Sequence, residues 1–248
     1  MRPVMIVTGG SQGIGAAIAR LAGSRGYAVA LTYQTSRERA EAVAANIVAN
    51  GGRAIAVHAE MADEASILSL FRQVDTQLGR LTALVNNAGI PGPTCTIEAV
   101  TAETIDRVMA VNVRAPFLTI REAISRMATD RGGTGGGIVN VSSRASALGG
   151  AGEWVHYGAS KGALDSLTIG ASKELAARGI RVNAVNPGLI ETELHARAGL
   201  PDRLNRMVGG VPMARTGSAD EVAEAVLWLL SEQASYITGA LIPVSGGR

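Results

Sequence analysis

Short apolar runs alternate with longer segments of helical periodicity along the whole chain. Seven of the runs are apolar on both faces, as strands covered on both sides of a parallel sheet are. They predict strands at Val4–Gly9, Tyr27–Tyr33, Arg53–Ala59, Ala83–Gly89, Gly137–Ser143, Ile180–Gly188 and Ala240–Gly247. The segments between them predict helices near residues 14–25, 36–50, 63–78, 102–129, 156–178 and 219–231.

Strictly alternating strands and helices predict an α/β fold, because a parallel strand needs a crossover connection that a helix supplies. Right-handed crossovers then favour a doubly wound, Rossmann-type sheet of seven parallel strands with helices on both faces. No linker or long internal repeat divides the sequence, so we expect one domain over residues 1–248.

Composition narrows the classes of function. Of 248 residues, 47% are hydrophobic and 18% are charged, with a net charge of +2 and no basic block, so a nucleic-acid partner is not expected. The single cysteine, Cys95, has no internal disulfide partner, which fits a reducing compartment. The sequence has neither signal-peptide features nor an apolar run of about 20 residues, so we expect a cytoplasmic protein without a membrane partner.

The glycine-rich segment TGGSQGIG, Thr8 to Gly15, joins the first predicted strand to the first helix. Glycines there let the chain turn tightly and let a pyrophosphate approach the unpaired amides of a helix N-terminus. The spacing of Gly9, Gly13 and Gly15 differs from the common dinucleotide fingerprint, and a flexible loop is the alternative interpretation. The position directly after a strand favours nucleotide binding.

The end of the second predicted strand indicates which dinucleotide is preferred. An acidic residue there would bind the ribose 2′-hydroxyl of NAD, but the sequence TYQTSRERAE has no acid before Glu38. Thr35, Ser36 and Arg37 are candidate donors to a 2′-phosphate, which favours NADP(H) with NAD(H) as the alternative. Arg37 and Arg39 can equally be solvated helix residues.

Tyr157 and Lys161 stand four residues apart in a predicted helix, so their side chains share one face. A nearby cation favours a phenolate and lowers the pKa of a tyrosine, which suits a proton donor and acceptor for carbonyl and alcohol interconversion. Ser142 and Ser143 end the fifth strand, and the sequence NNAG, Asn86 to Gly89, ends the fourth. In a doubly wound sheet both lie at the ligand-binding edge.

Taken together, these motifs resemble the short-chain dehydrogenase/reductase family over essentially the whole chain. The resemblance is carried, in order, by TGGSQGIG, NNAG, the asparagine of VNV, VSS, YGASK and NPGLIET. It implies a catalytic tetrad of Asn112, Ser143, Tyr157 and Lys161. In the family, the tyrosine exchanges a proton with the substrate and the lysine binds the nicotinamide ribose. The serine holds the substrate oxygen, and the asparagine keeps a water-linked proton path.

Ser143 stands fourteen residues before Tyr157, one more than is usual in the family, which we interpret as a one-residue insertion in GGAGEWVHY; Ser142 is the alternative. The resemblance places Asn86 near the adenosine ribose. The residues that it implies, together with the loop and strand-end candidates, give this set of cofactor-binding residues: Gly9, Ser11, Gln12, Gly13, Ile14, Gly15, Tyr33, Thr35, Ser36, Arg37, Glu60, Met61, Asn87, Ala88, Gly89, Tyr157, Lys161, Pro187, Gly188, Ile190 and Thr192.

The resemblance further implies a substrate lid near residues 189–217 and a homotetramer that uses the helices near 102–129 and 156–178 and the last strand. Glu191 and His195 are four apart, but one pair without further ligands does not predict a metal site. We expect an NADP(H)-preferring oxidoreductase for a small carbonyl or alcohol substrate. A non-catalytic dinucleotide sensor on the same fold is the main alternative. A methyltransferase would leave the tyrosine and lysine pair unexplained.

Overall fold

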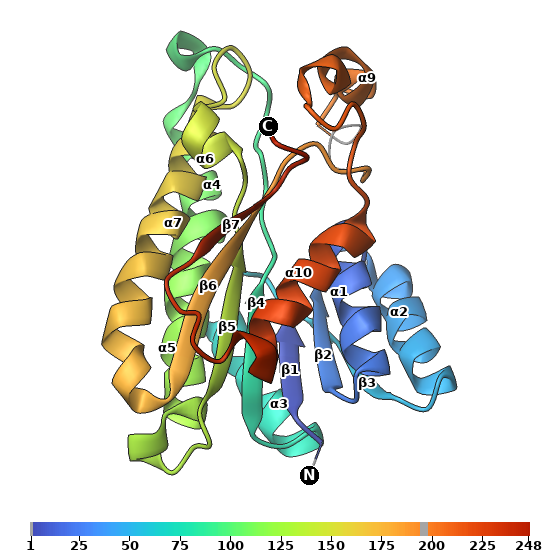
Figure 1. Cartoon of the computed structure of the whole chain (residues 1–248), viewed down its shortest axis with the longest axis vertical. Helices are drawn as coiled ribbons and strands as arrows, with labels where there is room; N and C mark the ends of the chain where they lie inside the picture. The colour runs from blue at the N-terminus through green and yellow to red at the C-terminus, as the bar shows by residue number, and fades with distance from the viewer. Residues whose placement is uncertain (1, 194–197) are drawn as a thin grey trace.

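In the computed structural model, which describes residues 2–193 and 198–248, seven parallel strands form one sheet (Figure 1). Their order across the sheet is β3-β2-β1-β4-β5-β6-β7. The strands are β1 (Val4–Val7), β2 (Ala28–Tyr33), β3 (Arg53–His58), β4 (Leu81–Asn86), β5 (Gly136–Val141), β6 (Ile180–Pro187) and β7 (Leu241–Val244). The doubly wound α/β fold and all seven predicted strands are confirmed.

The strand order reverses direction beside β1. The chain runs outward from β1 through β2 to β3, and then returns to place β4 on the other side of β1. The loops that follow β1 and β4 therefore leave the sheet in opposite directions and open a crevice at the carboxyl ends of the strands. Open α/β sheets bind their ligands at this kind of crevice.

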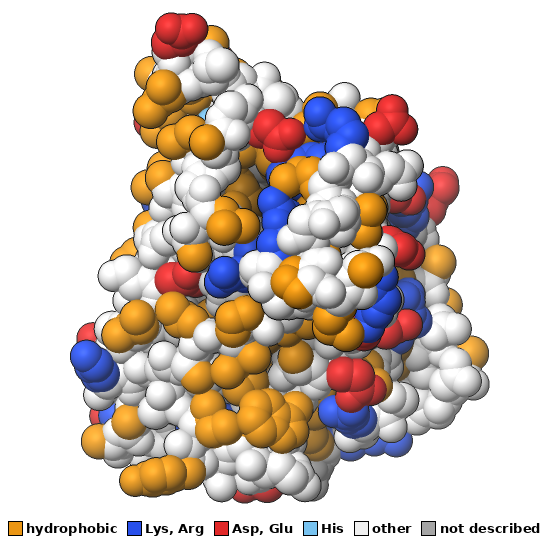
Figure 2. Space-filling view, turned by 45° about the horizontal axis from the view of Figure 1, so that its top comes forward, with side chains coloured by type: hydrophobic (Ala, Val, Ile, Leu, Met, Phe, Trp, Pro, Cys, Tyr) orange, Lys and Arg blue, Asp and Glu red, His pale blue; other side chains and the backbone are white. Residues whose placement is uncertain are grey.

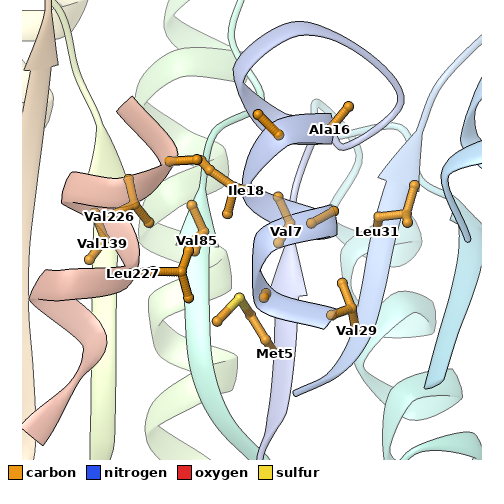
Figure 3. Packing of buried hydrophobic residues seen from close by; sticks show 14 of the residues in the cluster. Met5, Val7, Ala16, Ile18, Val29, Leu31, Val85, Val139, Val226 and Leu227 are labelled. Carbon is orange, nitrogen blue, oxygen red and sulfur yellow. The ribbon is translucent and has the colours of Figure 1, made fainter. Parts of the chain in front are cut away.

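One face of the sheet is covered by α1 (Gly13–Ser24), α2 (Arg37–Ala49) and α10 (Ala219–Leu230). Figure 3 shows Ile18 and Leu227 from α1 and α10 packed over Met5, Val7 and Val85 of the central strands. Burial of this apolar surface is the main stabilising contribution here, at about 25 cal/mol for each Å² removed from water. The packing is close because α1 presents small residues, among them Ala16, Ala19 and Ala22, to the sheet.

The other face is covered by α3 (Glu64–Gln77), α4 (Ala102–Met109), α5 (Ala115–Met127) and α7 (Val155–Leu175). Phe71 of α3, Met127 of α5 and Leu175 of α7 are buried against Leu84 and Ile138 of the strands. Helix α3 begins after Asp63, whose carboxylate accepts hydrogen bonds from the first-turn amides of Ala65 and Ser66.

The predicted helix near residues 102–129 is interrupted. A π-helical turn over Ala110–Arg114 separates α4 from α5, and Asn112 lies within it. Insertions of this kind often occur at functional sites because they redirect one side chain. Sequence periodicity also missed α6 (Ala145–Leu148) and α9 (Arg203–Met207), since four or five residues are too few to establish a helical period. Short 3₁₀ turns occupy Ile97–Ala99, Thr129–Arg131, Ala176–Arg178, Val208–Gly210 and Glu232–Ala234.

In the part of the chain that the structure describes, no helix combines the length and the apolar character that a bilayer crossing requires.

Candidate active site

A cleft of about 1280 Å³ lies along the carboxyl edge of the sheet. Figure 2 shows it as a hollow running over the face that carries the strand ends. One end is lined by the glycine loop and the loops after β2 and β3, and the other by Tyr157 and helix α9. The volume is large enough for an extended ligand such as a dinucleotide together with a small substrate.

The glycine loop holds a backbone conformation that side chains would disturb. Gly9 and Gly13 have φ values of 65° and 53°, in the left-handed region that favours glycine. A Cβ atom at Gly15 would lie 2.3 Å from the main-chain oxygen of Gly9 and 2.4 Å from Nδ2 of Asn87. Asn87 fixes the loop by donating from Nδ2 to the main-chain oxygens of Thr8, at 2.9 Å, and of Gly9, at 3.0 Å.

The start of α1 fits a bound pyrophosphate. Gln12 precedes the helix without a side-chain cap, so first-turn amides remain available at the wall of the cleft. Of the predicted cofactor residues, those that line the cleft are Gly9, Ser11, Gln12, Gly13, Ile14, Gly15, Tyr33, Thr35, Ser36, Glu60, Met61, Asn87, Ala88, Gly89, Tyr157, Lys161, Pro187, Gly188, Ile190 and Thr192. These residues fit a dinucleotide in an extended conformation.

Arg37 is the exception among the predicted cofactor residues. Its side chain is 72% exposed, lies outside the cleft lining and forms an ion pair with Glu41 at 2.7 Å. Arg39, two residues later on the same helix, points in another direction and reaches the glycine loop. Its Nη1 donates to Oε1 of Gln12 at 3.1 Å and to Oε2 of Glu193 at 2.7 Å. Residues two apart on a helix point in different directions, so Arg37 lies outside the cleft lining in this structure, and its role at the cofactor stays a prediction.

At the adenosine end, Asn86 differs from expectation and Glu60 agrees with it. Asn86, predicted to lie near the adenosine ribose, is buried and donates to Oδ1 of Asn140 at 2.9 Å, so its side chain serves the core. Glu60 does line the cleft and pairs with Arg107 at 3.2 Å. Partial burial raises the pKa of Glu60, but hydrogen bonds from the Ala62 amide and from Arg107 outweigh it, so the carboxylate stays ionised.

Tyr157 and Ser143 meet at the other half of the cleft. Tyr157 lies in the first turn of α7, and Ser143 follows β5, where its Oγ also accepts a hydrogen bond from the Ala145 amide at 3.1 Å. The Ser143 hydroxyl is close enough to the phenol to lower the pKa of Tyr157. Ser142 points elsewhere, since its buried Oγ donates to the main-chain oxygen of Lys161 at 3.2 Å. The geometry therefore favours Ser143 over Ser142 as the serine that faces a substrate.

Lys161 is 3% exposed and lies one turn after Tyr157, with Nζ 5.6 Å from the centre of the tyrosine ring. Its Nζ donates to the main-chain oxygen of Val141 at 2.8 Å. Burial lowers the pKa of Lys161 from its ordinary 10.5 to about 8, although the charge of Asp165 opposes the shift. The predicted proximity of the lysine and the tyrosine is present, as one helical turn requires.

The π-helical turn directs Asn112 toward this lysine. Asn112 is fully buried, accepts from the Ile90 amide at 2.9 Å and donates to the main-chain oxygen of Ile90 and to Oγ of Ser160. A Cβ atom at Gly89 would lie 3.3 Å from Oδ1 of Asn112 and 3.4 Å from Nζ of Lys161, so both side chains converge on that glycine. The absence of a side chain at Gly89 leaves space between them.

The expected lowering of the Tyr157 pKa is not what the structure gives. Burial raises the pKa of Tyr157 above its ordinary 10, and the hydrogen bond with Ser143 and the charge of Arg203 only partly offset this. Nζ of Lys161 lies 5.6 Å from the centre of the ring, and burial lowers the pKa of the lysine itself to about 8. The phenol therefore keeps its proton at neutral pH, which suits a proton donor to a carbonyl oxygen.

Sequence reasoning missed the basic side chains at the substrate end. Arg144, Arg203, Arg206 and Arg248 all line the cleft beyond Tyr157. They come from the loop after β5, from α9 and from the last residue of the sequence, so no spacing in the sequence connects them. Trp154 also lines the cleft. His156 does not, since its Nε2 lies 2.9 Å from the main-chain oxygen of Pro91.

The structure describes residues 189–193 and 198–217 of the predicted lid. Ala198, Arg203 and Met207 line the cleft, whereas Leu200 and Val208 do not. Leu194 and His195 lie outside the described residues. Within residues 2–193 and 198–248, no three histidine, cysteine, aspartate or glutamate side chains gather closely enough to hold a metal ion.

Comparison with known proteins places this site in a family. Residues 9–248 match the family model described as enoyl-(acyl carrier protein) reductase. The chain is 51% identical to an uncharacterized oxidoreductase, YgfF, of Escherichia coli over 245 residues, which is 99% of each chain. It is 39% identical over 243 residues to the 3-oxoacyl-[acyl-carrier-protein] reductase FabG of Staphylococcus aureus, covering 98% of this chain and 96% of that one.

A solved structure gives the same picture. A short-chain dehydrogenase from Burkholderia cenocepacia in complex with NADP superposes with a TM-score of 0.89 at 35% identity, covering 99% of this chain and 97% of that one. Similarity at this level extends over nearly the whole chain.

Proposed function

The chain belongs to the short-chain dehydrogenase/reductase family of NAD(P)-using oxidoreductases, and on that premise we propose that it reduces a small ketone or aldehyde with NADPH. In this proposal Tyr157 donates the proton that the new alcohol requires. The observation that carries it is that Tyr157 and Ser143 both line the cleft, where burial raises the pKa of the phenol and keeps it protonated.

In the proposed reduction, Ser143 and Tyr157 have different roles. Ser143 donates a hydrogen bond to the carbonyl oxygen and strengthens it as negative charge develops there. Tyr157 then transfers its phenolic proton to that oxygen, so the C=O bond becomes C–OH and the tyrosine becomes a phenolate. The bound dinucleotide supplies the hydride that reduces the carbonyl carbon.

Lys161 and Asn112 act behind the tyrosine. A protonated Lys161, 5.6 Å from the ring centre, stabilises the phenolate that proton transfer leaves. Asn112 holds the loop at Ile90 and lines the space at Gly89 beside the lysine. This arrangement supports a role for Asn112 in guiding a proton back toward Lys161 and Tyr157, as the family resemblance implies.

A preference for NADP(H) is supported by charge at the glycine loop. The end of β2, from Tyr33 to Ser36, carries no acid that would repel a 2′-phosphate. Arg39 lies against Gln12, and the ion pair that it forms with Glu193 is exposed to solvent. A phosphate on the adenosine ribose would give Arg39 a second anionic partner at this point.

Turnover by a tyrosine variant tests the proposed reaction. We expect Tyr157→Phe to lower kcat by about 10³-fold or more, since a positioned proton donor contributes about 10²–10⁴-fold and its loss also disturbs Ser143. The Kd for NADPH, measured by fluorescence titration, should change by less than about threefold. NADPH oxidation followed with a panel of ketones and aldehydes gives the turnover. A Phe variant that keeps most of its activity would show that the proton comes from another group.

Paired arginine variants test the cofactor preference. Arg39→Gln should weaken NADPH binding about tenfold and leave NADH binding nearly unchanged, because a charge-assisted hydrogen bond to phosphate contributes about 1.5–3 kcal/mol. Arg37→Gln is the matched control on the same helix and should alter neither affinity. Equal weakening of both cofactors by Arg39→Gln would point to a structural role for Arg39.

Two alternative functions, an enoyl reductase and a non-catalytic sensor, can be distinguished by the products of the same assay. The family model is described as an enoyl reductase, so conjugated enones belong in the same panel: C=C reduction would leave the carbonyl of the product intact. A non-catalytic sensor would bind NADPH tightly. It would not oxidise NADPH with any ketone, aldehyde or enone of the panel. The buried Lys161 and the protonated Tyr157 favour the enzyme, because a sensor has no need for proton-transfer groups.

The homotetramer and the cytoplasmic location also remain proposals. Exposed apolar side chains on the predicted contact elements support self-association: Ile105, Met109, Phe117 and Ile169. Light scattering of the purified protein measures the assembly directly.

A further inference from the structure

The substrate end of the cleft has a strong excess of positive charge. Arg144, Arg203, Arg206 and Arg248 line it, and Figure 2 shows basic side chains gathered along the central hollow. Among the residues that the structure describes, one acidic side chain of the lining faces them: Glu153, which pairs with Nε of Arg203 at 2.7 Å and with Arg206 at 3.4 Å.

The other acids of the cleft belong to its cofactor end. Glu60 is bound by Arg107 and Gln34, and Glu193 is bound by Arg39. Neither therefore balances the arginines beyond Tyr157. Even if a main-chain carboxylate at Arg248 is counted beside Glu153, the guanidinium groups remain in excess.

Arg203 is held in place next to the reacting tyrosine. Its side chain is 13% exposed, and its guanidinium carbon lies 4.8 Å from the centre of the Trp154 ring. The Trp154 ring in turn packs edge-on to the Tyr157 ring at 6.4 Å. The charge of Arg203 reaches far enough to favour the Tyr157 phenolate. Arg203 is therefore a fixed cation that contacts Trp154, and Trp154 in turn contacts the proton donor Tyr157.

Arg248 carries a charge that lacks a partner. Among the residues that the structure describes, none forms a hydrogen bond or an ion pair with its guanidinium, although the side chain is partly buried. Burial and the charges of Arg203 and Arg144 lower the pKa of Arg248, against a smaller opposing effect of Glu153. The main chain is fixed separately, since the main-chain oxygen of Arg248 accepts from Nε of Arg144 at 2.6 Å and from Oγ of Ser245 at 2.9 Å.

We infer that Arg203 and Arg248, with Arg144 and Arg206 beside them, form a subsite for an anionic group on the substrate. The substrate class is then an oxo acid: a carbonyl compound with a carboxylate or a phosphate at its far end. A partly buried cation without a partner, such as the guanidinium of Arg248, is destabilising, and an anion that enters would form charge-assisted hydrogen bonds with it and with its neighbours. This inference rests on the proposed carbonyl reduction and names its substrate class.

A set of matched substrates measures the preference. Pyruvate, acetoacetate and levulinate, each with its methyl ester, place a carboxylate at increasing distance from the ketone; 2-oxopropylphosphonate and its dimethyl ester test the phosphate-like source. We expect at least one acid to exceed its ester in kcat/KM by about tenfold or more, since hydrogen bonds to a charged group contribute about 1.5–3 kcal/mol. The acid that shows the largest ratio gives the spacing and the type of anion.

Variants then assign the preference to the subsite. Arg248→Gln should lower the acid-to-ester ratio about tenfold, because the guanidinium forms no hydrogen bond or ion pair with any residue that the structure describes, while the main-chain bonds remain. Arg178→Gln, which removes an arginine paired with Asp130 away from the cleft, is the control and should leave the ratio within about twofold. A ratio near one in the native protein, or a ratio unchanged in Arg248→Gln, would overturn the inference.

A binding measurement separates this inference from the proposed reaction. If no acid or ester is reduced, the proposed function fails, and calorimetric titration of the NADPH complex with succinate and with inorganic phosphate still tests the subsite. Binding of either anion that weakens in Arg248→Gln and not in Arg178→Gln would support the subsite. Absence of such binding would overturn it.

Discussion

Two clusters of polar side chains in this molecule differ in how many of their hydrogen-bonding groups have partners within the protein. The first, which we term the core amide network, consists of Asn86, Thr119, Asn140 and Thr168. Asn86 donates to Asn140 at 2.9 Å and accepts from Thr119 at 2.7 Å, and Asn140 donates to Thr168 at 2.8 Å. Each member is at most 3% exposed.

The second group is the reactive cluster of Asn112, Ser143, Tyr157 and Lys161. Asn112 and Lys161 are as deeply buried as the core network, but the hydroxyls of Ser143 and Tyr157 face the cleft. Lys161 makes one hydrogen bond, to Val141, where an ammonium can donate three. The cluster is therefore incomplete without ligands.

The comparison shows that similar residue types stabilise the fold in one cluster and remain available for ligands in the other. A closed network strengthens the fold, since every buried donor and acceptor has a partner. An open cluster lowers stability, because a buried ammonium is poorly solvated, and it keeps hydrogen-bonding capacity for a substrate and cofactor. We expect substitutions in the open cluster to affect activity most, and substitutions in the closed network to affect stability most.

The largest effect should come from Lys161→Met. We expect kcat/KM to fall by about 10³-fold or more, because both the phenolate and the cofactor lose the cation. At pH 7 the free energy of unfolding should instead rise by roughly 1–3 kcal/mol, since a buried charge is removed and only the bond to Val141 is lost. Activity assays and thermal unfolding on the same sample measure both.

The pH dependence checks the cause of that stabilisation. The pKa of Lys161 is about 8 in the folded protein and 10.5 as its ordinary value, so the unfolded chain binds more protons between these limits. Native stability therefore gains from this residue as pH rises from about 8 to 10.5, and the advantage of Lys161→Met should shrink over that window. A constant difference across the window would contradict the assignment to burial of charge.

The next largest effect distinguishes two adjacent serines. Ser143→Ala should lower kcat by about 10²-fold, because in the proposed reaction its hydroxyl lies beside Tyr157 in the cleft and donates to the carbonyl oxygen. Ser142→Ala should leave kcat within a few fold and lower the free energy of unfolding by about 1 kcal/mol, through loss of the bond to the main chain of α7. The reverse order of the two kcat values would make Ser142 the substrate-facing serine.

The smallest effect on activity should come from the core amide network. Asn140→Ala should lower the free energy of unfolding by about 2 kcal/mol, because Asn86 loses a buried partner. The Kd for NADPH should stay within about twofold. Asn50→Ala removes an exposed amide at the end of α2 and serves as the control, with a change below about 0.5 kcal/mol. A large fall in kcat in Asn140→Ala, under conditions where the variant remains folded, would show that the core amide network also supports the reactive cluster.

Several features of the site were predictable from the sequence. The glycine loop follows the first strand, so its place at the strand end was fixed once the strand was recognised. Tyr157 and Lys161 share a face because four residues make about one helical turn. Asn112 was identified by resemblance, but the π-helical turn that directs it inward depends on packing between α4, α5 and α7.

What the sequence by itself determined is therefore local: seven strands and the helices between them, the glycine loop, and the spacing of a tyrosine and a lysine on one helix. Tertiary structure alone decided that Arg39 rather than Arg37 reaches the loop, that Tyr157 keeps its proton, and that Arg203 and Arg248 meet at one end of the cleft. Periodicity follows from bonds between neighbours in the chain. Burial, charge balance and pKa depend on groups that approach only when the chain has folded.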